Sequence, residues 1–213
     1  MITYTGGSTQ EGQFTDESTT ITADQSEDAT LVLTDADFCT TETTVSADDL
    51  TSLLDTRDGQ RYQIVTIGTQ TWLAENFNYD YSGSLCYDDD AANCEEYGKL
   101  YNHIMITADD FAPEGWKVPS KNDYQTLIDF IGGDGSDLMV GGSSKFEGQL
   151  SGQYNSADKE FRQLDQYGWF ASSTKITEFS YTQLLLGFGD QLARLDNIFN
   201  EIEEYPAVRL LKK

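Results

Sequence analysis

The clearest potential for chemistry in this chain lies in a short polar segment between two cysteines, Cys86 and Cys94. Eight residues apart, the two thiols can reach disulfide geometry if the loop between them folds back on itself. Oxygen atoms in this loop, on Asp88, Asp90 and Asn93, are of the kind that calcium ions prefer. Consecutive side chains cannot all point inward, so the alternative to a structural calcium ion is a solvated acidic loop.

Groups suited to catalysis are few. The only histidine, His103, lies among apolar neighbours on a predicted helix, which favours a packing role. The sequence has no G-x-S-x-G nucleophile elbow, no His/Cys cluster with metal-ligand spacing and no glycine-rich loop with a phosphate-binding lysine. Acidic pairs are expected by chance among 37 Asp and Glu residues. We therefore expect a protein that is not an enzyme and that needs no cofactor, apart from the calcium alternative.

The elements that would position these groups begin with a hairpin. Strand-forming residues dominate 62–67, directly after the turn residues Asp58 and Gly59. We predict that the chain then turns and forms a second strand that begins at Trp72. Large aromatic side chains stabilise most when they are buried, so Trp72 is predicted to anchor the core. Near the N-terminus, the β-branched run 29–34 predicts another strand.

Two helices are predicted after the cysteine loop. The first spans residues 101–110. The second has clearer signals, with Ser120 as N-cap, Asp123 at the third helical position, and Gly132 and Gly133 at its end. Its apolar residues recur at the spacing of one buried face, and they are Tyr124, Leu127, Ile128 and Ile131.

The region after the second helix has little periodicity. Residues 132–165 are rich in Gly, Ser and Asp, which predicts a long loop excursion of the kind that carries function. Strand character returns at 168–173 and 181–188, and a final strand is predicted at 205–211.

Several short blocks occur in a recognisable order: 74–76 (Ala-Glu-Asn), 86–94 (Cys-Tyr-Asp to Asn-Cys), 115–120 (Gly-Trp-Lys-Val-Pro-Ser), 167–174 and 207–209 (Ala-Val-Arg). In that order they resemble the Fibrobacter succinogenes major paralogous domain, a family of bacterial surface modules, over residues 57–213. The resemblance implies an α+β, C-type-lectin-like fold with two helices, a twisted antiparallel sheet and a long loop excursion. It also implies that the last strand returns to the first hairpin.

The resemblance bears on the cysteines as well. The family carries the same cysteine block, which implies that Cys86 pairs with Cys94. Two further cysteines of the family pattern correspond to Ala112 and Leu210 in this chain. The loss of both implies that they pair with each other in the family and that this chain lacks the whole disulfide. Cys39 has no evident partner.

Charge excludes several classes of function. The net charge is −24, so the protein repels nucleic acid and anionic membranes. No apolar run is long enough to span a bilayer, which predicts no membrane insertion. Residues 1–56 contain twelve Asp and Glu and no Lys or Arg. We interpret them as a separate acidic, Thr-rich segment, β-rich or extended, that anchors or oligomerises the domain at 57–213, with a flexible stalk as the alternative.

Together these features predict a non-catalytic module, displayed on a surface, that recognises or adheres to a glycan or protein of a cell. A phage virion subunit, in a decoration or receptor-binding role and attached through 1–56, is one alternative, favoured by the lack of a visible signal peptide after Met1. A purely structural assembly subunit, including a homo-oligomer, is another. A disulfide favours an extracellular location, on a cell or a virion.

Ligand contacts are expected on exposed aromatic side chains of the later loops, because rings give a large contact area at low entropic cost. Asparagines nearby would add hydrogen bonds. The candidates are Tyr154, Asn155, Tyr167, Trp169, Tyr181 and Asn197.

Overall fold

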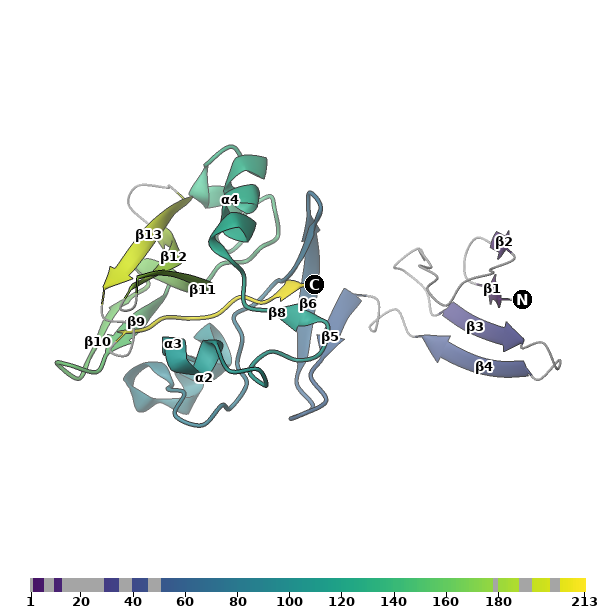
Figure 1. The fold of residues 1–213 in the computed structure, drawn as a ribbon, viewed down its shortest axis with the longest axis horizontal. Coiled ribbons are helices and arrows are strands. Elements are labelled where there is room, and N and C mark those ends of the chain that lie inside the picture. The colour runs from purple at the N-terminus through teal and green to yellow at the C-terminus, as the bar shows by residue number, and fades with distance from the viewer. Residues whose placement is uncertain are drawn as a thin grey trace. The chain divides into compact units, whose positions relative to one another are not determined.

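The computed structural model describes residues 2–5, 10–12, 29–34, 40–45, 51–177, 180–187, 193–199 and 204–213, with the backbone alone up to residue 45 and at 198–199. The chain forms two compact units, Met1–Leu54 and Asp55–Lys213 (Figure 1). The sequence predicted the division after residue 56. Cys39 lies outside the described residues.

The strands of the first unit are β1 (Ile2–Thr5), β2 (Gln10–Gly12), β3 (Ala29–Thr34), β4 (Thr40–Val45) and β5 (Ser52–Leu54). Strands β1 to β4 pair antiparallel in the order β2-β1-β3-β4. The strand predicted at 29–34 is confirmed as β3. Thr and Val dominate β4, and branching at Cβ favours their extended backbone.

The smaller sheet of the second unit contains β6 (Arg61–Ile67), β7 (Gln70–Leu73), β15 (Leu211–Lys212) and β8 (Trp116–Lys117), adjacent in that order. The predicted hairpin is confirmed, with Ile67 opposite Gln70 across a turn. Gly68 is required in this turn because its φ is +62°, and a Cβ there would lie 2.8 Å from the Phe130 ring. Leu211 pairs with Trp72, which confirms that the last strand returns to the hairpin.

The larger sheet contains β9 (Ser151–Asn155), β10 (Glu160–Leu164), β11 (Tyr167–Thr177), β12 (Ser180–Gly187) and β13 (Ala193–Phe199), in the order β10-β9-β11-β12-β13. Strands β9 and β11 run parallel, and the other neighbours run antiparallel. The strands predicted from 168 and 181 are β11 and β12. The long loop excursion predicted over 132–165 is wrong in its second half, where β9 and β10 form a hairpin.

The predicted final strand at 205–211 is interrupted. Its ends are β14 (Glu204–Tyr205), which pairs with β9, and β15, which pairs with β7 and β8. In Figure 1 the yellow C-terminal segment accordingly runs from the larger sheet to the smaller one. Ala207 bridges to Leu100 and Phe170 on the way, so this segment connects the two sheets.

The helical segments of the second unit are η1 (Tyr87–Asp89), α2 (Ala91–Tyr97), α3 (His103–Ile106), α4 (Lys121–Phe130) and η2 (Gly135–Leu138). Helix α4 begins as predicted, with a capping box between Ser120 and Asp123. Helix α3 is much shorter than the predicted 101–110. It begins at His103 because the preceding Asn102 has an extended backbone and caps the helix, with its side chain accepting a hydrogen bond from the Met105 N–H. Helix α2 was not predicted.

The core lies between α4 and the sheets. Trp72 is fully buried, as predicted, and its ring stacks on Tyr124 of α4 at 5.5 Å between centres. The Tyr124 hydroxyl donates to the Ala171 carbonyl oxygen of β11, so α4 is fixed to the larger sheet. Phe146 completes this contact against the edge of Trp72. None of the helices among the described residues has the length and apolar character needed to cross a membrane.

Candidate functional site

A surface groove of about 450 Å³ opens in the second unit. Ligand pockets typically measure roughly 300–1,000 Å³, so the groove is large enough for a ligand. One wall is the C-terminal end of α2, and the other is the chain between η2 and β9. The described residues that line it are Glu96, Tyr97, Met139, Val140, Gly148, Gln149, Leu150 and Asp165.

The α2 wall is held by its cap and by a disulfide. The Asp90 carboxylate accepts a hydrogen bond from the Ala92 N–H at 3.0 Å, which satisfies one of the free donors at the start of the helix. Cys86 and Cys94 form a disulfide, with 4.9 Å between their Cα atoms, as the family resemblance implied. Because Cys94 lies within α2 and Cys86 before it, the bond ties the helix to the preceding segment.

A buried arginine, Arg209, holds the opposite wall. Its Nη1 donates to the Phe146 carbonyl oxygen at 2.6 Å, and its Nη2 donates to the Glu147 carbonyl oxygen at 3.0 Å. The guanidinium carbon also lies 4.5 Å from the centre of the Phe146 ring, in a cation–π contact. Burial lowers the pKa of Arg209 to about 9, which leaves the side chain protonated at neutral pH.

Asn76 connects the two walls. Its Oδ1 accepts a hydrogen bond from Arg209 Nη2 at 2.7 Å, and its Nδ2 donates to the Tyr97 carbonyl oxygen at 2.8 Å. Arg209 Nη1 also donates to the Leu73 carbonyl oxygen at 3.1 Å. A single buried network therefore runs from the end of α2 through Asn76 and Arg209 to residues 146 and 147. We call it the Asn76–Arg209 bridge.

A second link joins α2 to Asp165, another lining residue, which lies between β10 and β11. The Tyr97 hydroxyl donates to Asp165 Oδ1 at 2.9 Å, and the Asp165 N–H donates to the Leu150 carbonyl oxygen at 2.9 Å. Burial, followed by the nearby Asp165 carboxylate, raises the pKa of Tyr97 to about 12. The hydroxyl therefore keeps its proton and remains a donor at neutral pH.

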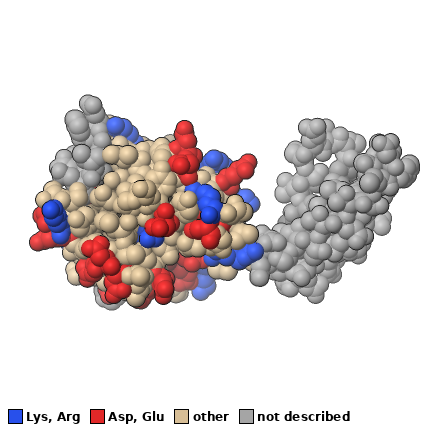
Figure 2. Space-filling model, turned by 90° about the horizontal axis from the view of Figure 1, so that it is seen from below, with Lys and Arg blue, Asp and Glu red and all other residues tan. Residues whose placement is uncertain are grey.

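The lining combines aliphatic side chains with carboxylates. Met139 and Leu150 are half-buried, whereas the side chain of Val140 is 65% exposed. Glu96 and Asp165 are exposed beside them, and none of the described lining residues is Lys or Arg. The groove is therefore acidic through its own residues. Figure 2 shows one face of the molecule, on which acidic and basic side chains both lie around a broad uncharged area.

Comparison with known families assigns the chain. Residues 65–212 match the family described as the Fibrobacter succinogenes major domain. The chain belongs to this family. No curated protein and no solved structure matches it. The blocks 74–76 and 207–209, which carry the resemblance in the sequence, supply the two side chains of the Asn76–Arg209 bridge in this member of the family.

Sequence reasoning assigned no role to Asn76 or Arg209. A signal was present for Arg209, because a single arginine stands inside the apolar run 207–211, where a buried position is expected. Glu96, Val140 and Asp165 carried no such signal. They are far apart in the chain, and only the tertiary structure brings them to one groove.

The predicted ligand contacts do not gather into one site. Tyr167 and Trp169 lie together on β11 with 5.9 Å between ring centres, and both are half-buried. The Trp169 indole N–H donates to Gln163 Oε1 at 3.1 Å. Asn197 is exposed on β13. None of the six candidates belongs to the described lining of the groove.

Two of the candidates have structural contacts around β9. The Tyr154 ring packs against the Phe161 ring at 4.6 Å and the Tyr205 ring at 5.6 Å between centres. Asn155 Nδ2 donates to Glu204 Oε1 at 2.6 Å, across the pairing of β9 with β14. These contacts hold the hairpin to the C-terminal segment.

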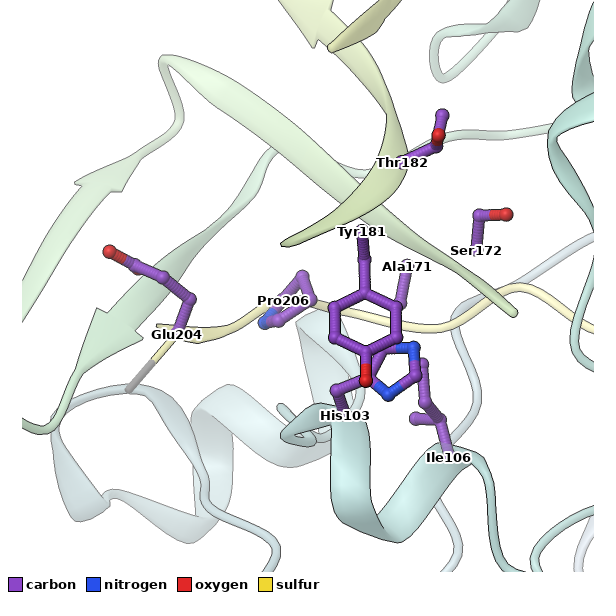
Figure 3. Close-up of a pocket in the computed structure, with 8 residues that line it drawn as sticks. All are labelled: His103, Ile106, Ala171, Ser172, Tyr181, Thr182, Glu204 and Pro206. Atoms are coloured by element: carbon purple, nitrogen blue, oxygen red, sulfur yellow. The ribbon is translucent and has the colours of Figure 1, made fainter. Parts of the chain in front are cut away.

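The expectation that Tyr181 is exposed is wrong, since its side chain is only 5% exposed. It lies under α3, where the His103 ring stacks on the Tyr181 ring (Figure 3). The cavity beside the two rings measures about 10 Å³, which leaves room for one water molecule at most. His103 is itself buried, which confirms its predicted packing role.

The structure gives the calcium alternative no support. The carboxylates of Asp88 and Asp90 are exposed, and Asp90 caps α2. Asn93 Nδ2 donates to the Tyr87 carbonyl oxygen at 2.8 Å. In the part of the chain that is described, no group of three or more His, Cys, Asp and Glu side chains is placed to hold a metal ion. These contacts favour capping groups and a solvated acidic loop.

His103 makes stability depend on pH. Burial, followed by the positive charge of Lys175, lowers the pKa of His103 to about 3 in the folded chain. Between this value and its unfolded pKa of about 6.5, the unfolded state binds a proton that the folded state does not, so the free energy of unfolding decreases as pH falls. From about pH 7 to about pH 5, we expect wild type to lose about 2 kcal/mol more than His103→Gln.

Urea unfolding of both proteins at the two pH values checks this expectation. The carboxylates titrate in both proteins, so the difference between them isolates His103. Equal losses in the two proteins would mean that His103 is protonated without penalty in the folded chain.

Proposed function

We propose that the second unit is a non-catalytic recognition module whose groove binds a protein or glycan on a cell surface. The observation that carries the proposal is the Asn76–Arg209 bridge, which connects both walls of the groove through buried hydrogen bonds. A groove held in this way is formed before the ligand arrives. Binding then orders few groups of the protein, which lowers its entropic cost.

The fold that we propose for this unit is C-type-lectin-like. Three features support it: the mixed α+β composition, the pairing of the last strand with the first hairpin, and the position of α4 against the larger sheet. One scaffold can host many activities, so the functional proposal rests on the groove and not on the fold.

We further propose an extracellular location. The Cys86–Cys94 disulfide supports it, because disulfides persist in oxidising surroundings outside the cytoplasm. The groove would then meet its ligand on a cell or from a virion.

For the first unit we propose a role in attachment or assembly. It has a sheet of its own, built from a stretch without Lys or Arg. This feature keeps two alternatives open for the whole chain, a phage virion decoration or receptor-binding subunit and a purely structural assembly subunit. Light scattering of the purified chain separates both of these alternatives from the adhesion module, because a stable trimer or filament supports the virion and assembly roles and a monomer supports the adhesion module.

The proposed site is tested by filling the groove. We expect Val140→Arg to weaken binding to glycan and peptide arrays by about tenfold or more, because the long cationic side chain occupies the lining. Ile104→Arg is a matched control, since Ile104 is 64% exposed, close to the 65% of Val140, but lies on α3 outside the groove. Both variants should melt close to wild type, because exposed substitutions cost little stability. Equal binding by wild type and Val140→Arg would contradict the proposal.

A further inference from the structure

The residues that line the groove indicate what kind of ligand it binds. This inference rests on the proposed function of the groove as a recognition site. The lining has an aliphatic part, formed by Met139, Val140 and Leu150, and an acidic part, formed by Glu96 and Asp165. We propose that the groove binds a basic peptide segment, with an arginine or lysine against the two carboxylates and an adjacent aliphatic side chain on the aliphatic part.

Charge complementarity favours a cationic ligand. Glu96 and Asp165 are both exposed, and the described lining has no basic side chain to neutralise them. An arginine placed between them gains charge-assisted hydrogen bonds to carboxylate oxygens. The net charge of −24 adds a long-range attraction for cations and repels anionic ligands, including phosphate-bearing surfaces.

The shape and chemistry of the lining favour a peptide over a sugar. A sugar ring is usually held against an exposed flat aromatic face. The only ring in the described lining belongs to Tyr97, which is half-buried and has its hydroxyl committed to Asp165. Unbranched Met139 and exposed Val140 instead offer an adaptable surface for an aliphatic side chain.

The Tyr97–Asp165 hydrogen bond prepares the acidic part for this ligand. Because the Tyr97 hydroxyl donates to Oδ1 of Asp165, the carboxylate is held in the lining of the groove. A carboxylate that accepts one hydrogen bond still has free acceptor positions for a guanidinium group. The positioned acid therefore binds the cation without a further loss of side-chain freedom.

The test measures binding of three capped hexapeptides to the full chain by fluorescence anisotropy. The first alternates arginine and leucine, the second has citrulline in place of arginine, and the third has glutamate. We expect measurable binding of the first peptide alone, with an affinity that decreases as salt is raised. Citrulline preserves the shape of arginine without its charge, so it separates charge recognition from apolar contact.

A matched pair of double variants shows whether the groove is responsible. Glu96→Gln with Asp165→Asn removes two groove charges, and we expect it to weaken binding of the arginine peptide about tenfold. Glu95→Gln with Asp129→Asn changes the net charge equally at two exposed positions outside the lining, and should weaken it less than about twofold. Melting temperatures verify that both proteins are folded.

The outcomes separate this inference from the proposed function. Equal weakening by both double variants, or no binding of the arginine peptide, would overturn the inference. If a glycan binds and Val140→Arg abolishes its binding, the groove is a recognition site but the ligand class is wrong. If Val140→Arg changes no binding of any kind, both proposals fail.

Discussion

Arg209→Met is expected to lower the free energy of unfolding of the full chain by about 3–5 kcal/mol. Methionine preserves the apolar stem but donates no hydrogen bond. The substitution therefore leaves four acceptors without their donor. Three are buried, namely the carbonyl oxygens of Leu73 and Phe146 and Oδ1 of Asn76, and the Glu147 carbonyl oxygen is partly buried. Urea unfolding followed by tryptophan fluorescence measures the change, because Trp72 lies in the same core.

Arg162→Met is the control for this prediction. Arg162 is half-buried on β10, and its ion pairs are with Asp158 and Glu160 at the surface. Surface ion pairs contribute about 0–1 kcal/mol, so this variant should remain close to wild type. If the two methionine variants are equally stable, the Asn76–Arg209 bridge does not hold the domain together.

Removal of the disulfide is the second large effect that we expect. In a Cys39→Ser background, which prevents thiol exchange, Cys86→Ser with Cys94→Ser should lower the free energy of unfolding by about 2–3 kcal/mol. The bond closes a short loop, and its loss restores freedom to the unfolded chain. Binding in the groove should weaken as well, because Glu96 and Tyr97 follow Cys94 on α2.

A reducing agent supplies the internal check. It should destabilise the Cys39→Ser protein to the level of the serine variants, and it should leave those variants unchanged. A reduced protein as stable as the oxidised one would show that the cap and Asn76 alone hold α2, and that the disulfide contributes nothing to its position.

The parts of the fold with strong local signals were predictable. The turn at Gly68 and the capping box of Ser120 and Asp123 are each formed by residues close together in the chain. The sequence therefore predicted β6, β7 and α4. The hairpin of β9 and β10 was missed because Ser151–Asn155 has neither β-branched residues nor alternation. Its stability comes from pairing with distant strands, β11 and β14.

The helices also differ in how far local sequence signals define them. Helix α2 has a weak sequence pattern, and its fixed position depends on a disulfide and on Asn76, which lies outside it. Helix α3 was predicted to begin too early, because Asn102 is its N-cap and not part of it. The Asn102 side chain also donates to the Tyr205 hydroxyl, so in both helices a contact with a segment outside the helix accompanies the feature that the sequence pattern missed.

The candidate site was predicted less well than the fold. Aromatic type suggested Tyr181 as a ligand contact, but its position under His103 depends on where α3 packs. The groove joins residues from positions 96, 140 and 165, and no spacing rule in the sequence connects them. Arg209 was recognised only as part of a block, since its four acceptors lie on two distant segments, 73–76 and 146–147.

Recognition through the groove is tested most directly by comparing two variants on the ligand that the wild type binds best. Val140→Arg blocks the groove, and Trp169→Ala removes the largest ring of the Tyr167–Trp169 pair, which lies outside it. The groove account predicts that Val140→Arg loses binding by about tenfold or more while folded Trp169→Ala retains it. Retained binding in Val140→Arg together with its loss in Trp169→Ala would contradict the account and place the ligand on β11.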